Sequence, residues 1–293
     1  MIKDFLDYLK YEKNYSSHTI LSYKIDLLQF CNFLNTKPEV FNVSEVTSMQ
    51  IQQWIASMMS EKKSPRTISR KISTLKSFWH FLLERKVVNQ NPTLRIILPK
   101  IKKPLPSFFK NEEMEKVLDE TFLLENFEAQ RDHLILEIFY LTGIRLSELI
   151  SIQDTDIDLK EGILRVIGKR NKERMIPLSK KLCEDIEHYI QLRDQQIEIK
   201  NNWLFVRKNG EKLYPKWVYN KIHRTMSDVS TLNKKSPHVL RHSFATALLN
   251  EGADINAVKE LLGHSSLAAT QVYTHTSFKE LYNIYKQTHP RAK

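Results

Sequence analysis

Residues 236–246 read Ser-Pro-His-Val-Leu-Arg-His-Ser-Phe-Ala-Thr, with His238 three positions before Arg241. A Ser-Pro pair is typical of a helix start, because serine can cap free backbone N–H groups and proline fits the first turn. Positions three apart lie on one face of a helix. This stretch therefore predicts a helix whose first turns present a histidine and an arginine that can reach the same anion.

Two other interpretations of this stretch stay open. His238 and His242 are four apart, which is the spacing of a helical zinc pair, but Val239 stands where an HExxH zinc protease has its glutamate. His238 could also act only as a cap for a buried backbone group. No metal site is predicted from this pattern.

Three further segments carry side chains that could act together with His238 and Arg241. Arg145 follows a glycine at the end of an apolar run and is expected in the first turn of a helix, where free N–H groups and the helix dipole favour an anion. His264 follows Gly263, which is suited to end the helix predicted for residues 255–262. Tyr273 lies nine residues later. A single tyrosine in such a place is more often a core residue than a catalytic one, so its interpretation depends on its neighbours.

Residues 157–178 have the pattern of a β-hairpin. β-branched residues flank a Gly/Asn-containing turn, and this places Lys169 near the tip. Trp203–Val206 is expected to form a further short strand. The rest of the C-terminal part is predicted to be helical.

Residues 1–98 are predicted to form a small helical bundle, because apolar residues recur at three- and four-residue intervals. Of the net charge of +11, +7 falls on residues 1–100, where fifteen Lys and Arg face eight Asp and Glu. This surplus of positive charge in the N-terminal part favours salt-dependent contact with phosphates. A helix face that is merely solvated is an equal alternative. The basic residues gather at and before a helix that starts at Ser64-Pro65: Lys62, Lys63, Arg66, Arg70, Lys71 and Lys76.

The length of 293 residues favours two domains, since domains commonly hold about 100 to 200 residues. Four prolines bracket a basic extended segment, so residues 99–107 are expected to be a linker. Cys31 and Cys183 show no ligand or disulfide spacing, which favours a reducing cytoplasm. No apolar run reaches the roughly 18 to 20 residues of a spanning helix, so no membrane partner is expected.

In chain order, five segments resemble those of the tyrosine site-specific recombinases, especially their bacterial Xer-type members. The resemblance extends over essentially the whole chain. Its most specific parts are Thr142-Gly-Ile-Arg-Leu-Ser-Glu-Leu149, Gly168-Lys169, His238-Val-Leu-Arg-His-Ser-Phe-Ala-Thr246, Leu261-Leu-Gly-His-Ser-Ser266 and Val272-Tyr-Thr-His275. The fold it implies is a two-domain DNA clamp, mainly α-helical with a small β-sheet. Residues 1–98 would form a SAM-like core-binding domain and residues 108–293 the catalytic domain.

The resemblance also implies six catalytic residues: Arg145, Lys169, His238, Arg241, His264 and Tyr273. Tyr273 would attack the scissile phosphate and form a 3′-phosphotyrosyl link, helped by His238 as the group that takes its proton. Arg145 and Arg241 would clamp the non-bridging oxygens, while the remaining histidine adds a hydrogen bond. Lys169 would protonate the leaving 5′-oxygen. Because the covalent link conserves the bond energy, no ATP, metal or other cofactor is expected.

The expected partner is a duplex DNA recombination site, contacted through Arg66, Thr67, Arg70 and Lys71 of the basic helix. By the resemblance, the protein is a monomer in solution and part of a homo- or hetero-tetramer on two synapsed sites. A second Xer-type recombinase and a cell-division DNA translocase are possible further partners. Two positions depart from the family pattern: Arg170, often glycine, and Ala247, often histidine.

Three functions remain open on the sequence alone. Resolution of chromosome dimers by an Xer-type recombinase is favoured by the length of the chain and by its ending, His289-Pro-Arg-Ala-Lys293. An integrase or invertase of a mobile element or phase-variable locus would use the same chemistry. A DNA-binding accessory protein without strand transfer is disfavoured by the complete set of catalytic groups.

Overall fold

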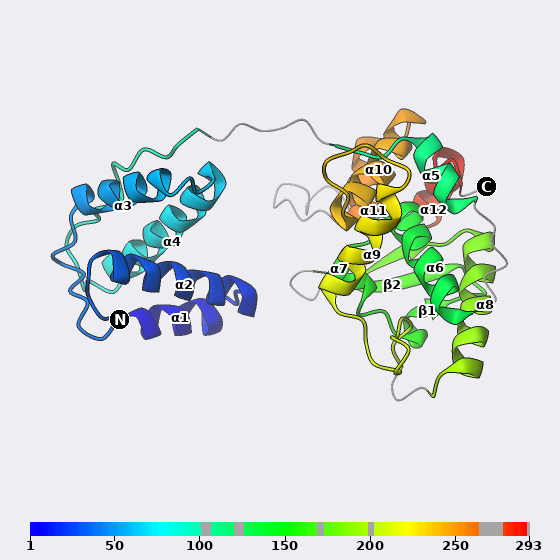
Figure 1. Cartoon of the computed structure of the whole chain (residues 1–293), viewed down its shortest axis with the longest axis horizontal. Helices are drawn as coiled ribbons and strands as arrows, with labels where there is room; N and C mark the ends of the chain where they lie inside the picture. The colour runs from blue at the N-terminus through cyan, green and yellow to red at the C-terminus, as the bar shows by residue number, and fades with distance from the viewer. Residues whose placement is uncertain (101–106, 120–125, 169–172, 199–201, 264–277, 292–293) are drawn as a thin grey trace. The chain divides into compact units, whose positions relative to one another are not determined.

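The computed structural model describes residues 1–100, 107–119, 126–168, 173–198, 202–263 and 278–291, and the chain divides into two compact units (Figure 1). The units are Met1–Pro104 and Leu105–Lys293. Most of the linker expected at residues 99–107 lies outside the described residues, so its limits stay a prediction. Among the described residues, no helix combines the length and apolar character needed to cross a membrane.

The first unit is helical in its described part. Its helices are α1 (Ile2–Tyr11), α2 (Ser17–Phe33), α3 (Ser48–Ser60) and α4 (Pro65–Glu84). Side-chain caps explain three of the starts, because Ser16, Thr47 and Ser64 each accept a hydrogen bond from a backbone N–H in the first turn. The core is aromatic, with Phe30 and Trp79 fully buried. The helical bundle expected from the apolar periodicity is confirmed, including the start of α4 at Ser64-Pro65.

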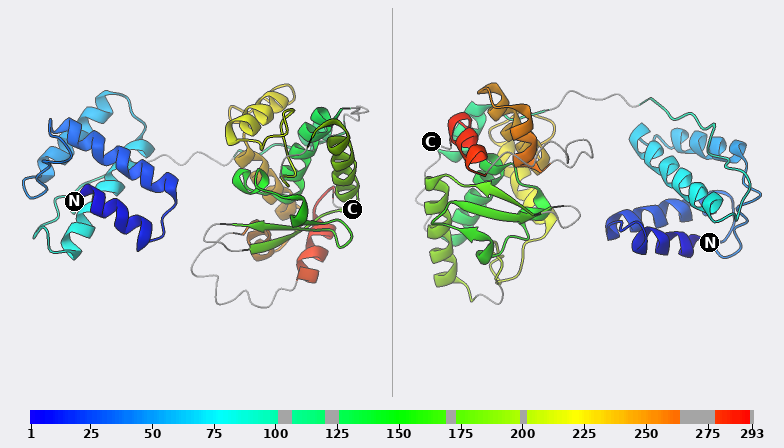
Figure 2. Two further views of the ribbon diagram at one scale, coloured as in Figure 1. Left: turned by 90° about the horizontal axis from the view of Figure 1, so that it is seen from below. Right: turned by 180° about the vertical axis from the view of Figure 1, so that it is seen from behind.

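The second unit combines helices with a small sheet (Figures 1 and 2). Its helices and strands are α5 (Asn111–Leu118), α6 (Phe127–Thr142), α7 (Leu146–Leu149), the 3-10 helix η1 (Asp154–Asp156), β1 (Ile157–Asp158), β2 (Ile163–Ile167), β3 (Glu173–Pro177), α8 (Lys180–Gln196), α9 (Pro215–Ser227), α10 (Pro237–Asn250), α11 (Ile255–Leu262) and α12 (Phe278–Thr288). A mainly α-helical chain with a small β-sheet was the expected fold class, and it is confirmed.

The sheet is antiparallel with the order β1-β2-β3, and Val166 of β2 lies opposite Arg174 of β3. The two strands of the expected hairpin are therefore present. The tip that would carry Lys169 lies outside the described residues. The strand expected at Trp203–Val206 is wrong: Trp203 and Val206 form only isolated bridges, to Gln153 and Lys212.

Helix α6 is the centre of this unit, because it is buried on nearly all sides between α8 and α10. Helices α10, α11 and α12 group at one end of the unit (Figure 1), where α12 packs against α10, α11 and β3 of its own chain. Among the α12 residues whose burial is described, Leu281 and Tyr285 are buried in this contact. The C-terminal helix α12 thus packs against α10, which contributes residues to the candidate site described below, and against α11.

His289 anchors the end of α12 in a neutral state. Its ring is fully buried and stacks on Phe244 with centroids 5.5 Å apart. Nδ1 accepts a hydrogen bond from the backbone N–H of Arg291, so Nε2 carries the proton and donates to the Tyr140 carbonyl oxygen at 3.2 Å. A second proton on Nδ1 would have no acceptor there. Burial lowers the pKa of His289 to about 4, with the nearby charge of Arg291 acting in the same direction.

We expect the free energy of unfolding to fall by about 2 kcal/mol between pH 7 and pH 5 through His289 alone. The unfolded histidine titrates near pH 6.5, whereas the folded one resists protonation down to about pH 4. The stabilisation is therefore complete above about pH 6.5 and is lost as pH falls toward 4. Urea unfolding at both pH values should show that His289→Phe lacks this part of the pH dependence. An unchanged pH dependence in the variant would contradict the assignment.

Candidate functional site

Three of the predicted catalytic residues meet at one cavity of about 280 Å³ in the second unit. Arg145 lies between α6 and α7, whereas His238 and Arg241 come from the first two turns of α10. Helix α10 begins at Pro237 as expected, although the Ser236 side chain makes no capping hydrogen bond. The full lining is Ile144, Arg145, Leu146, Tyr219, Lys234, Ser236, Pro237, His238 and Arg241.

Gly143 allows α10 and α11 to pack closely against the end of α6. It ends α6 in the left-handed conformation, with φ of 58°. A Cβ atom at this position would lie 2.5 Å from Cδ1 of Phe244 and 2.8 Å from Cδ2 of Leu262, so α10 and α11 approach too closely for any side chain. Arg145 then follows as the N-cap of the short helix α7, and not in the first helical turn as expected. The difference arises because the backbone stays extended for one more residue before the helix begins.

The two arginines are held by carbonyl groups at helix ends. Arg145 donates from Nη2 to the Gly263 carbonyl oxygen at 2.8 Å. Arg241 donates from Nη2 to the Leu262 carbonyl oxygen at 2.5 Å and from Nη1 to that of Gly143. The last carbonyls of a helix have no partner within it, so these guanidinium groups satisfy them. Each arginine also keeps further N–H groups, since a guanidinium has five.

Positive charge exceeds negative charge around this cavity. The Glu148 carboxylate pairs with both Arg145 and Arg174, while the described hydrogen bonds of Arg241 go to carbonyl oxygens. Burial lowers the pKa of Arg241 to about 9, and the charges of Arg145 and Arg174 act in the same direction. A buried cationic group with this much like charge nearby is stabilised by a bound anion. The cavity therefore has the chemistry of a phosphate-binding site.

We expect inorganic phosphate to raise the melting temperature of the protein by about 3 °C at saturating concentration, as a ligand that binds only the folded state does. Sodium chloride of equal ionic strength is the control for general screening. Arg241→Lys should reduce the phosphate-specific shift, because lysine cannot bind the anion through two parallel hydrogen bonds. An equal shift in chloride and phosphate would show that the cavity does not bind the anion.

The other three predicted catalytic residues, Lys169, His264 and Tyr273, lie outside the described residues, as does Arg170. The residues directly before two of them, Gly168 and Gly263, are described. Gly263 ends α11 in the left-handed conformation directly before His264, as its sequence predicts. Ala247, the other departure from the family pattern, is buried on α10.

The predicted DNA-contact residues on α4 differ in exposure. Arg66 is exposed and Thr67 is partly buried in the first turn of the helix. The Arg70 side chain is 45% exposed, although it donates to Asp26 and to the hydroxyl group of Ser22. These three residues remain candidates for phosphate contact.

Lys71 is not part of the exposed basic face, and the prediction that it faces DNA is wrong. Its side chain is 7% exposed, and Nζ donates to Oδ1 of Asp26 at 2.9 Å. Asp26 is fully buried and also accepts a hydrogen bond from the Thr74 hydroxyl at 3.0 Å. The lysine satisfies a buried carboxylate that would otherwise be costly, so its role is to join α2 to α4.

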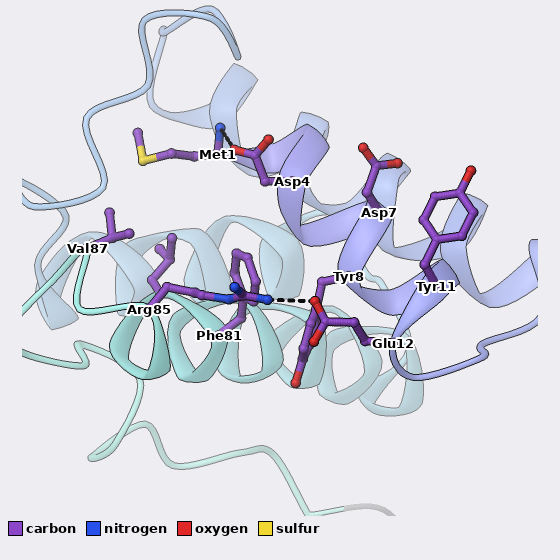
Figure 3. A pocket seen from close by; sticks show the side chains of 10 residues that line it. Met1, Asp4, Asp7, Tyr8, Tyr11, Glu12, Phe81, Arg85 and Val87 are labelled. Carbon is purple, nitrogen blue, oxygen red and sulfur yellow. Dashed lines mark hydrogen bonds and ion pairs between the residues drawn. The ribbon is translucent and has the colours of Figure 1, made fainter.

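A second cavity, of about 430 Å³, lies in the first unit between α1 and the C-terminal part of α4 (Figure 3). None of the predicted site residues lines it. Several of its charged groups are already paired, because Asp4 contacts the N-terminal amine at 2.9 Å and Glu12 contacts Arg85 at 2.6 Å. In the described ranges, no group of three or more His, Cys, Asp or Glu is placed to hold a metal ion.

Sequence reasoning missed three residues at the first cavity. Lys234 and Tyr219 line it, and Arg174 forms a salt bridge with Glu148, which also pairs with Arg145 of the lining. The Lys234-Lys235 pair next to Ser236-Pro237 was a usable signal, because basic residues before a helix start favour a phosphate. No local sequence pattern indicates that Tyr219 or Arg174 belongs to the site.

Both units of the chain match known protein families. Residues 107–280 match the model of the "Phage integrase family", and residues 2–86 match "Phage integrase, N-terminal SAM-like domain". The chain is 37% identical to a protein named tyrosine recombinase XerC from Thermodesulfovibrio yellowstonii, covering 100% of this chain and 97% of the relative. It is 39% identical to the protein of that name from Staphylococcus haemolyticus, covering 99% and 96%.

Solved structures show the same fold. A structure of the XerH site-specific recombinase bound to a palindromic difH substrate superposes with a TM-score of 0.72 at 23% identity, covering 98% of this chain and 84% of that one. The XerA recombinase is 26% identical with a TM-score of 0.50, covering 99% and 98%.

Proposed function

This chain belongs to the phage integrase family and is a site-specific tyrosine recombinase of the Xer type, and we propose that Tyr273 is its nucleophile and the resolution of chromosome dimers its role. The observation that supports the site assignment is the convergence of Arg145, His238 and Arg241 on one cavity with surplus positive charge. Two separate segments of the chain supply these groups: Arg145 lies between α6 and α7, and His238 and Arg241 lie on α10.

The reaction follows from where charge develops. The Tyr273 oxygen attacks the scissile phosphorus, the bond to the 5′-oxygen breaks, and a 3′-phosphotyrosyl link replaces it. Negative charge then accumulates on the non-bridging oxygens, where Arg145 and Arg241 donate hydrogen bonds. His238 takes the phenol proton, because a tyrosine with an ordinary pKa of about 10 is mostly protonated at neutral pH. Lys169 delivers a proton to the leaving 5′-oxygen.

The remaining steps need no added energy. The second histidine, His264, donates a hydrogen bond to the same phosphate. A 5′-hydroxyl of the partner strand then attacks the phosphotyrosyl link, which restores a phosphodiester and releases the tyrosine. Each phosphodiester bond that is broken is replaced by a new one, so strand exchange proceeds without ATP.

Residues 1–98 bind DNA in this proposal, with residues 99–107 as the linker to the catalytic residues 108–293. Arg66, Thr67 and Arg70 contact the backbone of the recombination site. Such contacts position the protein on the duplex more than they read its sequence. Their release of counterions makes affinity fall steeply with salt.

The working assembly is a tetramer of recombinases on two synapsed sites, with a second Xer-type recombinase and a cell-division DNA translocase as possible partners in the cytoplasm. In the single chain, α12 buries Leu281 and Tyr285 against its own neighbours. Movement of this helix to the corresponding surface of a neighbouring subunit would link assembly to activation of the tyrosine.

Strand exchange itself is the test of the proposed function. A plasmid with two directly repeated candidate sites is incubated with the protein, alone and with a second recombinase, in EDTA without ATP. Two smaller circles, each with one site, are the expected products. Their absence in both cases, despite tight binding to the site, would favour a DNA-binding accessory protein. Efficient inversion or integration at mobile-element sites alone would favour the second candidate role.

A further inference from the structure

Arg174 on β3 makes an unusually complete set of contacts for a strand residue. Nη1 and Nη2 donate to the two oxygens of Glu148, each at 2.9 Å, in a bidentate pair. Nε donates to the Leu261 carbonyl oxygen near the end of α11 at 3.1 Å. All three nitrogens of the guanidinium therefore have protein acceptors, and the side chain is only 13% exposed. Because its three guanidinium nitrogens all donate to protein acceptors, Arg174 can affect a nearby site only through these partners.

Glu148 is the partner that leads to the phosphate site. Its Oε1 accepts from Nη1 of Arg145 at 2.7 Å, and its Oε2 accepts from the Arg145 backbone N–H at 2.9 Å. Burial alone would raise the pKa of the Glu148 carboxyl, but the hydrogen bonds and charge of Arg174, with those of Arg145, lower it to about 2. Arg174 thus keeps a nearly buried carboxylate ionised, and this carboxylate orients Arg145.

Arg174 also packs on the turn that ends α11. A Cβ atom at Gly263 would lie 2.9 Å from Cδ of Arg174 and 3.2 Å from its Nε. The Gly263 carbonyl oxygen is itself the acceptor for Nη2 of Arg145. The same guanidinium therefore fixes both acceptors that hold Arg145: the Glu148 carboxylate directly, and the Gly263 carbonyl through the turn beneath it.

We propose that Arg174 is a positioning residue for strand cleavage, because it holds Glu148 and the end of α11 in the arrangement that aims Arg145 at the scissile phosphate. Without it, Glu148 would keep Arg145 as its main cationic partner and would draw more of its N–H groups away from the phosphate. The proposal rests on the proposed function, since Arg145 has a phosphate to bind only if the protein cleaves DNA.

The test compares full-length variants in single-turnover cleavage of a nicked duplex. Arg174→Met removes the guanidinium, and Arg174→Lys keeps the charge but cannot form the bidentate pair. Arg165→Met is the matched control, because Arg165 is an exposed arginine on the neighbouring strand β2. Each protein is assayed with an ordinary scissile phosphate and with a methylphosphonate at that position, which lacks the negative charge. DNA binding and melting temperature are measured alongside.

Arg174→Met is expected to form the covalent complex about 100-fold more slowly on the phosphate duplex, the scale of a catalytic group misplaced by about 1 Å. Arg174→Lys should fall between this variant and the wild type, and Arg165→Met should equal the wild type. On the neutral methylphosphonate, the defect of both Arg174 variants should shrink to within about fivefold, because less charge needs to be clamped. Affinity for the DNA site should stay near that of the wild type.

Two results would overturn the inference while the wild type remains active. One is cleavage by folded Arg174→Met and Arg174→Lys within about threefold of the wild type on the phosphate duplex. The other is an equal loss on both duplexes, as a general loss of structure gives. If the wild type forms no covalent complex with either duplex, the proposed function fails, and with it this inference.

Discussion

Tyr273→Phe is expected to abolish covalent attachment to DNA while leaving DNA binding nearly unchanged. The substitution removes one oxygen atom, and that oxygen is the nucleophile in the proposed reaction. Loss of a nucleophile that works with a set of catalytic groups lowers the rate on the order of 10⁴-fold or more. The phosphate contacts of Arg145 and Arg241, and those of the N-terminal unit, do not depend on it.

The measurement is a denaturing gel of a nicked duplex with a label on the scissile strand. The nick lets the short 5′-hydroxyl fragment diffuse away, so the covalent complex accumulates. Tyr214→Phe is the matched control, because Tyr214 is an exposed tyrosine before α9, and we expect it to form the complex as the wild type does. A Tyr273→Phe protein that still forms the covalent complex would show that another residue attacks the phosphate.

Arg241→Lys is expected to lower the cleavage rate by about 10² to 10³-fold, as the loss of a donor to a developing oxyanion does. Lysine keeps the charge but offers neither the planar fork nor enough directed N–H groups to hold the Gly143 and Leu262 carbonyls and a phosphate together. Burial also opposes a charged lysine at this position, since it already lowers the pKa of Arg241 to about 9.

Single-turnover cleavage at saturating protein separates this effect from weaker binding. The lost carbonyl partners are expected to cost about 1 to 3 kcal/mol of stability, so thermal melting must show that the variant is folded at the assay temperature. A folded Arg241→Lys protein that cleaves within about threefold of the wild type would contradict the role assigned to Arg241.

Local sequence signals predicted the parts of the fold that depend on neighbouring residues. Gly143 and Gly263 end helices where the sequence indicates, because left-handed backbone favours glycine. The Ser64-Pro65 start of α4 and the hairpin strands follow from equally local patterns. The shared face of His238 and Arg241 is a consequence of helical spacing, so the core of the candidate site could also be predicted.

Contacts between distant residues were not predictable in this way. Lys71 appears on a basic helix, but its carboxylate partner Asp26 is 45 residues away in the chain. Arg174 reads as an ordinary strand residue, although its partners are Glu148, 26 residues before it, and Leu261, 87 residues after it. A single sequence carries no periodicity that links such pairs, so burial and pairing emerge only when the chain is folded.

Peptide mapping of the trapped DNA complex tests the central claim most directly. Trypsin cuts after Lys259 and Lys279, and residues 260–279 contain Tyr273 as their one tyrosine. After nuclease treatment, mass spectrometry is expected to find this peptide carrying a nucleotide on Tyr273 through a 3′-phosphate. A nucleotide on a different peptide, or one attached through a 5′-phosphate, would contradict the account.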